Sequence, residues 1–525
     1  MRTRWALALI LILTVVPRLA QLPVMRESNM SPDTAHFLNV ARCLQRDQGL
    51  SNPAAWPAWL QPARLPMPDT WKEPGYPWLM ARFARAGIDP FRAGQAVSLI
   101  AGILFPFAVW LLGRQLAADP LVALLAALMA AGSPELVDKS VSALSESLFG
   151  LFVALTFLCA AWRLREPGRA NRPLVLDVLT GALFGACHLL RSQALLALPA
   201  LAALISCGRP LRRSLAGSVL AAVTALAVLS PFIVRNLRLF GVPFYSDAWA
   251  TGMWAYADPI MLSHGVDRPP ELMEFALEHP REVLAHQLWS LKRFLIGTLP
   301  RQLYGNPIWV LACAVGLYAV RRQWRDWLFV VLYAGISMGA ILTLSWEPRY
   351  FVSSMSAWCL LAAAGANWAA RTFDENRNRA AVARGLPPRR EIAAVLVLVL
   401  AAIGPLVVTL RQPGRVSVEP ALEIAAARHY TPFLRSRLAR DEAVMVETTS
   451  YWAWFVDRPV VHLVIADSTR FLETVHRLKV RWAVLPTRLL PTLASHYPDH
   501  RLPAALVLDR EDTARGVTLY RVMEP

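Results

Sequence analysis

The sequence predicts a polytopic α-helical membrane protein with about eleven transmembrane helices and a small soluble α/β domain at its C-terminal end. Two features of composition predict this class. Of the 525 residues 55% are hydrophobic and only 17% are charged, whereas soluble domains carry about 25% charged residues. The apolar residues are also gathered into runs of about 20 residues, the length that a helix needs to cross a hydrocarbon layer of roughly 30 Å.

The loops between the apolar runs predict one orientation. If the N-terminus is cytoplasmic, every loop on that side is rich in Arg, whereas the short connections at 136–144 and 345–350 on the other side are nearly balanced. This is the positive-inside pattern, and it accounts for the net charge of +17 without a nucleic-acid partner. The expected spans are 5–22, 94–113, 119–135, 145–162, 174–190, 194–208, 214–233, 306–320, 327–345, 350–369 and 391–410.

The N-terminal run also fits a signal peptide, because Arg2 and Arg4 precede a short apolar stretch. We expect an uncleaved first helix, since no clear site of small residues for cleavage follows it. Both interpretations place the next segment outside the cytoplasm. The six cysteines are scattered singly and show no spacing typical of a metal site.

The orientation predicts two domains. A transmembrane domain spans 1–410, with long outside loops at 23–92 and 235–305, and a soluble domain spans 411–525 on the same outside face. The first loop carries two amphipathic stretches, 33–45 and 76–86, which are expected to form helices in the plane of the membrane surface.

The soluble tail alternates expected strands with expected helices, a pattern that favours an α/β domain. Its Tyr451, Trp452 and Trp454 fit either stacking on a sugar or the core of the domain. The strands are expected at 443–447, 459–464, 481–485, 504–508 and 517–522, and the helices at 468–478 and 489–496.

Charged residues of the first loop are candidates for chemistry. Asp33 follows Pro32 at the start of an amphipathic run, so it fits a helix N-cap as well as a catalytic carboxylate. Lys72 and Glu73 stand among Trp, Tyr and Pro residues. A cation in such a setting suits a phosphate headgroup, and it also suits a lysine that reaches from the membrane to its surface.

Further candidates lie at the outer ends of the predicted spans, where ionisable groups tend to face a protein cavity. Glu146 fits either a site residue or a carboxylate at a helix N-terminus. Arg235 and Arg349 fit phosphate binding or anchoring to lipid headgroups, and Arg191 is a candidate because an Arg at the outer face breaks the positive-inside bias locally. One carboxylate with several cations at one membrane level suits chemistry on a lipid-linked phosphate.

The order of these motifs resembles bacterial GT-C glycosyltransferases of the protein O-mannosyltransferase and aminoarabinose transferase clan. The resemblance covers about residues 1–370 and includes Pro-Asp before an amphipathic helix, a Lys-x-Pro-x-Tyr-Pro segment, Ser-Glu-Ser-Leu-Phe and Glu-Pro-Arg-Tyr. It implies a GT-C-like fold in the bacterial inner membrane, with a cytoplasmic N-terminus and a periplasmic C-terminal domain. It also implies a polyprenyl-phosphate sugar donor and a glycan, lipid or protein acceptor.

The resemblance carries over to single residues. Asp33 matches the catalytic aspartate of the first loop, Lys72 the lysine of a Lys-Pro-Pro-type motif, and Arg349 the arginine of the late outer loop. This chain departs from the clan at Thr34, where a second acidic residue is common. Glu73 and Glu146 are therefore both open as the second carboxylate. A divalent metal is possible, but no cofactor is expected to be required, because several cations can stabilise the phosphate.

Two other functions fit the composition. A transporter or flippase of a lipid-linked substrate would also be polytopic, but such proteins often show internal repeats and charged sites near the membrane centre. Here no repeat is visible and the charges lie at the outer rim. A noncatalytic scaffold that keeps the fold is the other alternative.

Overall fold

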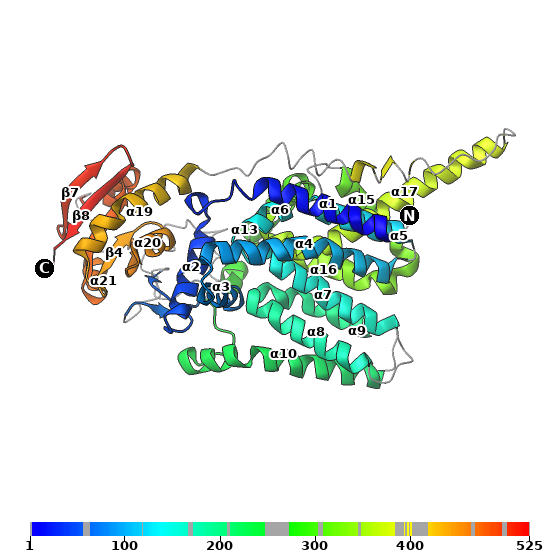
Figure 1. The fold of residues 1–525 in the computed structure, drawn as a ribbon, viewed down its shortest axis with the longest axis horizontal. Coiled ribbons are helices and arrows are strands. Elements are labelled where there is room, and N and C mark those ends of the chain that lie inside the picture. The colour runs from blue at the N-terminus through cyan, green and yellow to red at the C-terminus, as the bar shows by residue number, and fades with distance from the viewer. Residues whose placement is uncertain are drawn as a thin grey trace. The chain divides into compact units, whose positions relative to one another are not determined.

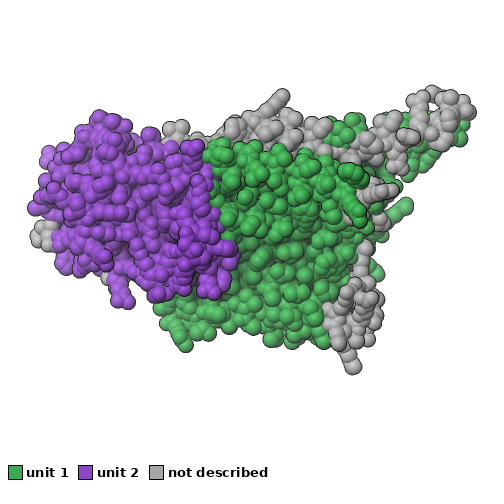
Figure 2. Space-filling view, viewed as in Figure 1, with its two compact units in different colours: residues 1–24, 95–245, 285–414 green, residues 25–94, 246–284, 415–525 purple. Residues whose placement is uncertain are grey.

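The computed structural model describes two compact units (Figure 2). One comprises Met1–Val24, Gln95–Tyr245 and Ala285–Gly414, and we call it the helical unit. The other comprises Met25–Gly94, Ser246–Leu284 and Arg415–Pro525, and we call it the α/β unit. The described residues are 3–55, 64–117, 119–165, 172–206, 211–246, 272–302, 308–344, 348–383, 393, 396–397, 399–401, 418–463, 468–495 and 501–523.

The helical unit is built from long apolar helices. Among the described residues, four are long and apolar enough to cross a membrane: Arg4–Gln21, Pro90–Leu116, Glu146–Arg163 and Leu215–Phe240. The total of eleven spans stays a prediction. The helices are α1 (Thr3–Gln21), α4 (Pro90–Leu116), α5 (Pro120–Ala131), α6 (Pro134–Val141), α7 (Glu146–Arg165), α8 (Arg172–Leu190), α9 (Leu198–Ser206), α10 (Leu211–Phe240), α13 (Pro280–Arg293), α14 (Leu299–Gln302), α15 (Ile308–Ala319), α16 (Trp324–Leu344) and α17 (Met355–Ala383), with the short turns η2 (Ser192–Ala197), η4 (Phe294–Thr298), η5 (Val320–Gln323) and η6 (Pro348–Ser354).

Helix packing in this unit depends on close backbone approach. Helix α8 packs against α7 and α10, and α17 packs against α5 and α15 (Figure 1). A Cβ atom on Gly181 of α8 would clash with the carbonyl group of Ala221 on α10, and one on Gly365 of α17 would clash with that of Ala312 on α15. Small residues at such crossings are typical of membrane helices, since packing drives their association.

Several predicted boundaries differ from the structure. The expected span 119–135 ends at Ala131, because Ser133 and Pro134 begin a new helix at an angle of 54° to α5. Ser133 Oγ accepts the Leu136 N–H, and proline suits the first helical position. Helix α10 continues to Phe240, past the expected end at 233. Most of the expected span 391–410 lies outside the described residues.

The α/β unit is built around a mixed six-stranded sheet with the order β2-β5-β4-β6-β8-β7. Strands β2, β5, β4 and β6 are parallel, whereas β8 pairs antiparallel with β6 and β7. The tail supplies α19 (Val418–Arg437), β4 (Ala443–Val446), α20 (Thr449–Val456), β5 (Val460–His462), α21 (Ser468–Arg477), β6 (Val480–Pro486), η7 (Thr487–Leu489), α22 (Leu490–Ser495), β7 (Leu506–Asp512) and β8 (Val517–Val522).

The first outer loop contributes to the same unit. It supplies η1 (Glu27–Asn29), α2 (Pro32–Gln45), β1 (Ser51–Asn52), β2 (Ala54–Ala55), β3 (Met67–Pro68) and α3 (Gly75–Arg85), and α12 (Leu272–Glu278) comes from the second loop. Strand β2 pairs with β5 of the tail. The division at 410/411 that the sequence predicts therefore places β2 in a different domain from the rest of its sheet.

Both faces of the sheet are covered by apolar side chains. Phe471 and Val475 of α21 pack on one face with Tyr520. Tyr430 of α19 and Trp452 of α20 pack on the other. Tyr451, Trp452 and Trp454 are 1%, 2% and 8% exposed, so these aromatic side chains belong to the core and are not available to stack on a sugar.

Glu423 of α19 makes the stability of this unit depend on pH. Its Oε1 accepts the Thr448 N–H at 3.2 Å, at the start of α20. Burial, together with the nearby Glu447 carboxylate, raises the pKa of Glu423 to about 7 from 4.5. Because the folded state binds this proton more tightly than the unfolded state, folding stability falls as the pH rises from 4.5 through 7.

We therefore expect Glu423→Gln to melt at a higher temperature than wild type at pH 8, and to melt within a degree or so of it at pH 5. Melting of the purified protein at the two pH values measures this. Glu473→Gln, at an exposed position on α21, is the control and should behave as wild type at both. A lower melting temperature for Glu423→Gln at pH 8 would contradict the assignment.

Candidate active site

The start of helix α2 leaves the Asp33 carboxylate available. Ser31 is the N-cap, and its Oγ accepts the Thr34 N–H at 3.1 Å. Pro32 follows at the first helical position, which suits its fixed backbone angle. The interpretation of Asp33 as the N-cap is therefore wrong. Asp33 lies one residue further into the helix, in its first turn, where a negative charge is stabilised by the helix dipole.

Asp33 pairs with Lys72, the cation of the second first-loop motif. Lys72 Nζ donates to Asp33 Oδ1 at 2.9 Å, and the two side chains are 17% and 19% exposed. The pair is thus partly shielded from water and still reachable from outside. An ammonium group has three donors, so Lys72 can donate to Asp33 and also to a second anion.

A second pair lies one helical turn further along α2. His36 Nε2 donates to the carboxylate of Asp69 at 3.0 Å, and Asn52 Nδ2 contacts the His36 ring at 3.2 Å. Residues 33 and 36 on the helix thus meet residues 72 and 69 on the loop, in antiparallel order. The two pairs hold this loop on the helix. Sequence reasoning missed Asp69, although its spacing of three residues from Lys72 matches that between Asp33 and His36.

The helical unit holds a second group of predicted site residues. Arg191 Nη1 donates to Glu146 Oε1 at 2.8 Å, and the two side chains are 12% and 3% exposed. Arg349 Nη2 donates to the Tyr350 hydroxyl group at 3.2 Å. The Arg191 and Arg349 guanidinium groups lie 5.6 and 5.0 Å from the centre of the Tyr350 ring, and both act electrostatically on Glu146.

Helix α6 adds charged residues that sequence reasoning missed. Lys139 Nζ lies 2.7 Å from Asp138 Oδ2 and 3.6 Å from Glu135 Oε1, and it also acts on Glu146. The Glu135 and Lys139 spacing of four residues is a helical signal, and the structure has a helix where the sequence predicts a short connection at 136–144. With Arg191 and Arg349, the group contains three cations and three carboxylates.

The other two candidates have separate surroundings. Arg235 Nη1 donates to Asn236 Oδ1 at 2.8 Å, and its guanidinium group lies 5.7 Å from the centre of the Phe240 ring. Glu73 is partly buried beside Lys72 in the chain. The structure therefore brings Asp33 together with Lys72 in the α/β unit, and Glu146 together with Arg191 and Arg349 in the helical unit.

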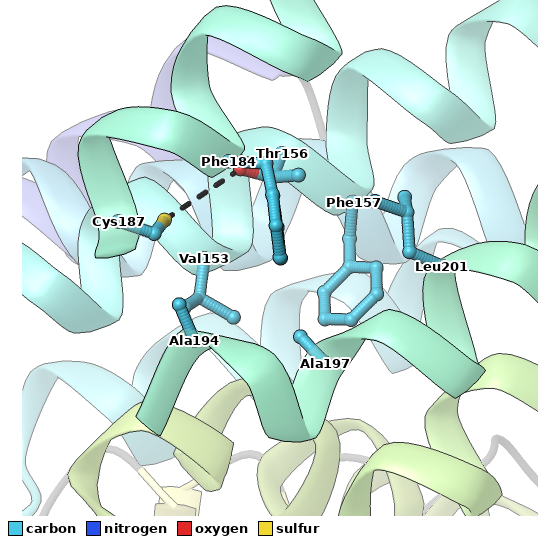
Figure 3. Close-up of a pocket in the computed structure, with 8 residues that line it drawn as sticks. All are labelled: Val153, Thr156, Phe157, Phe184, Cys187, Ala194, Ala197 and Leu201. Carbon is cyan, nitrogen blue, oxygen red and sulfur yellow. Dashed lines mark hydrogen bonds between the residues drawn. The ribbon is translucent and has the colours of Figure 1, made fainter. Parts of the chain in front are cut away.

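An apolar pocket lies elsewhere in the helical unit (Figure 3). Side chains of α7, α8, η2 and α9 line it, with one polar contact of 3.8 Å between Thr156 Oγ1 and Cys187 Sγ. It encloses about 10 Å³, roughly the volume that a single water needs. None of the charged candidates lines it.

Within the described ranges, no three His, Cys, Asp or Glu side chains are grouped as a metal site would require. The Asp33, Asp69 and Glu146 carboxylates are instead each paired with a Lys, His or Arg side chain. The expectation that no cofactor is required stays a prediction.

Comparison with known proteins supports the resemblance that the motifs predict. A family model described as dolichyl-phosphate-mannose-protein mannosyltransferase matches residues 69–234. That range includes Lys72, Glu146 and Arg191, whereas Asp33 and Arg349 lie outside it. No curated protein sequence matches the chain significantly.

Solved structures are similar over nearly the whole chain. ArnT from Cupriavidus metallidurans in the apo state has a TM-score of 0.61 at 12% identity, over 99% of this chain and 98% of that one. The same protein bound to undecaprenyl phosphate has a TM-score of 0.58 at 11% identity, over 99% and 98%. The oligosaccharyltransferase AglB from Archaeoglobus fulgidus, with an inhibitory peptide and a dolichol-phosphate, has a TM-score of 0.62 at 12% identity, over 97% and 73%. The GT-C-like fold is confirmed.

Proposed function

We propose that this chain, a membrane glycosyltransferase of the GT-C class, moves a sugar from a polyprenyl-phosphate donor to an acceptor hydroxyl or amine on the periplasmic face of the bacterial inner membrane. The observation that carries the proposal is the Asp33–Lys72 pair, a carboxylate and an ammonium group 2.9 Å apart. Solved relatives with this fold bind undecaprenyl phosphate or dolichol-phosphate, which supports a donor of this kind.

Asp33 is the general base in this proposal. Its carboxylate takes the proton from the acceptor as the acceptor oxygen or nitrogen attacks the anomeric carbon of the sugar. The bond from that carbon to the phosphate oxygen breaks, and polyprenyl phosphate leaves with the bonding electrons. The sugar carbon is inverted, because a single displacement with no covalent intermediate changes its configuration once.

Cationic side chains stabilise the charge that grows on the leaving phosphate. In the α/β unit this role is assigned to Lys72. In the helical unit it is assigned to Arg349, with Arg191 and Arg235 as further contributors. In the helical unit the charge of Arg191 is matched by Glu146. Glu146 therefore acts mainly by orienting the guanidinium groups around Tyr350. The mechanism draws on these side chains alone and requires no metal.

The sidedness of the proposal rests on the Arg-rich loops. About eleven spans with a cytoplasmic N-terminus place residues 23–92, 235–305 and 411–525 in the periplasm. Asp33 and Lys72 then lie where a lipid-linked donor presents its sugar after crossing the membrane. The acceptor is a glycan, a lipid or a protein of the cell envelope.

The direct test uses purified protein with a radiolabelled polyprenyl-phosphate sugar and envelope extract as the source of acceptor. Release of polyprenyl phosphate that depends on the extract supports the enzyme. Movement of the intact donor across the liposome membrane without cleavage would support a transporter. If neither release nor movement is observed, the result would support a noncatalytic scaffold. A mass difference between the surface glycans of wild-type and deletion strains would then identify the product.

Lys72→Met is expected to lower kcat about 100-fold, because it removes a charge that is needed when the phosphate leaves. Initial rates of polyprenyl phosphate release measure this. The matched control is Lys479→Met, which breaks an ion pair with Asp441 on the exposed surface of the tail. Exposed pairs contribute little, so this variant should transfer at the wild-type rate. Equal rates for both variants would remove Lys72 from the mechanism.

A further inference from the structure

Helix α20 of the tail lies directly against helix α2, which carries Asp33. Asn39 in the middle of α2 is fully buried, and its Nδ2 donates to the Ser450 carbonyl oxygen at 2.8 Å. Both helices belong to the α/β unit, although more than 400 residues separate them in the chain. The tail is therefore in direct contact with the element that presents the proposed base.

The C-terminal end of α2 is held by charge. Arg42 Nη1 donates to the Trp454 carbonyl oxygen at 2.9 Å and to Asp457 Oδ1 at 3.1 Å. Arg46 makes two parallel bonds of 2.8 Å to the same carboxylate. Asp457 adopts the left-handed conformation that ends α20, with φ +54°. Both Arg side chains thus grip the C-terminal end of α20.

The N-terminal end of α2 is held by Tyr451. The side chain of Tyr451 is 1% exposed, and its hydroxyl group donates to the Met30 carbonyl oxygen at 3.1 Å. Met30 directly precedes the N-cap Ser31, and Asp33 is in the first turn after it. Burial, together with the nearby Glu423 and Asp33 carboxylates, raises the pKa of Tyr451. The phenol therefore stays protonated and keeps donating to Met30.

We infer that α20 is the positioning element for Asp33, and that Tyr451 is the positioning residue that sets the first turn of α2 through the Met30 carbonyl oxygen. A carboxylate that acts as a base must be held within hydrogen-bond reach of its proton, and helix ends fray unless neighbouring groups fix them. Contacts at both ends and in the middle leave α2 little freedom to move. The inference rests on the proposed function, because Asp33 matters for activity only if it is the base.

Two tyrosine variants of the full chain test the inference. Tyr451→Phe removes the bond to Met30 and keeps the ring in the core. Tyr430→Phe is the matched control, since it removes a bond of 2.6 Å to Asp512 Oδ2, a residue of β7 in the same tail. Both lose one hydrogen bond of a tyrosine, so general loosening of the tail affects them alike.

Amide hydrogen exchange reads the position of α2 without any assay of transfer. We expect the amides of residues 33–37 to exchange about five- to tenfold faster in Tyr451→Phe than in wild type, because the hydrogen bond to Met30, just before the N-cap, is lost. Tyr430→Phe should leave these amides unchanged. The inference is overturned if these amides exchange in Tyr451→Phe at the wild-type rate, or if they exchange equally faster in both variants.

Kinetics then separate positioning from stability. Tyr451→Phe is expected to lower kcat about tenfold with the donor KM within twofold of wild type, and to shift the acidic limb of the pH profile of kcat, which reports the base. Tyr430→Phe should change neither. A wild-type pH profile and kcat in Tyr451→Phe overturn the inference and leave the proposed function intact. Absence of transfer by the wild type overturns the proposed function, while exchange still decides the positioning.

Discussion

Asp33→Asn is expected to lower kcat for sugar transfer by about 10²- to 10⁴-fold, the usual contribution of a general base. The amide keeps the shape of the side chain and can still accept a hydrogen bond from Lys72, but it does not take up the proton of the acceptor. Acceptor-dependent release of polyprenyl phosphate from membranes of equal protein content measures the change.

The folded state should tolerate this substitution. The Asp33–Lys72 pair is partly exposed, and pairs of this kind contribute about 1 kcal/mol or less to stability. Asp441→Asn, which weakens an exposed pair of the tail, is the matched control and should transfer normally. Turnover of Asp33→Asn at the wild-type rate, with normal expression, would remove Asp33 from the role of base.

Arg191→Met is expected to have the largest effect on stability. It leaves the Glu146 carboxylate buried without its main partner, and breaking a buried ion pair costs about 3–5 kcal/mol. Replacing both residues, as Glu146→Leu with Arg191→Met, should restore most of that stability, because an apolar pair of similar volume packs without an uncompensated charge. Thermal unfolding of the three proteins measures this.

Activity of the stable double variant then decides what the pair does. We expect transfer to stay at least 100-fold below wild type, because the proposed mechanism uses the guanidinium group of Arg191 to stabilise the leaving phosphate. Replacement of the buried pair formed by Arg163 and Asp177 in the same unit by Met and Leu is the control, and that variant should keep its activity. Wild-type transfer by the Glu146 and Arg191 double variant would show that the pair is purely structural.

The spacing of apolar residues predicted helices and strands well where one face of the element is apolar and buried. The alternation of the tail predicted β8 at its observed bounds, and it predicted α21 and β4 to within one residue at each end. Apolar runs likewise predicted the long membrane helices. Ends were missed where a local signal was overlooked, as at the cap formed by Ser133 or at the first turn after Ser31.

The sequence did not predict that the sheet of the tail includes a strand from the first loop. Strand β2 is only two residues long and lies in the first loop, yet it pairs with β5 of the tail. So short a strand has no alternation to reveal it, and its partner lies about 400 residues away in the chain. Helix α2 of the first loop also packs against α20 of the tail.

By itself the sequence predicted a polytopic membrane protein, and it named as candidate site residues Asp33, Lys72, Glu73, Glu146, Arg191, Arg235 and Arg349. These conclusions follow from composition, charge order and local motifs, which are properties of neighbouring residues. The tertiary structure alone decided that Asp33 pairs with Lys72, that Glu146 pairs with Arg191, and that Tyr451 binds Met30, just before the N-cap of α2. Such pairs join elements that are separated in the chain. Their partners are determined by packing and by the cost of burying a charge without a partner.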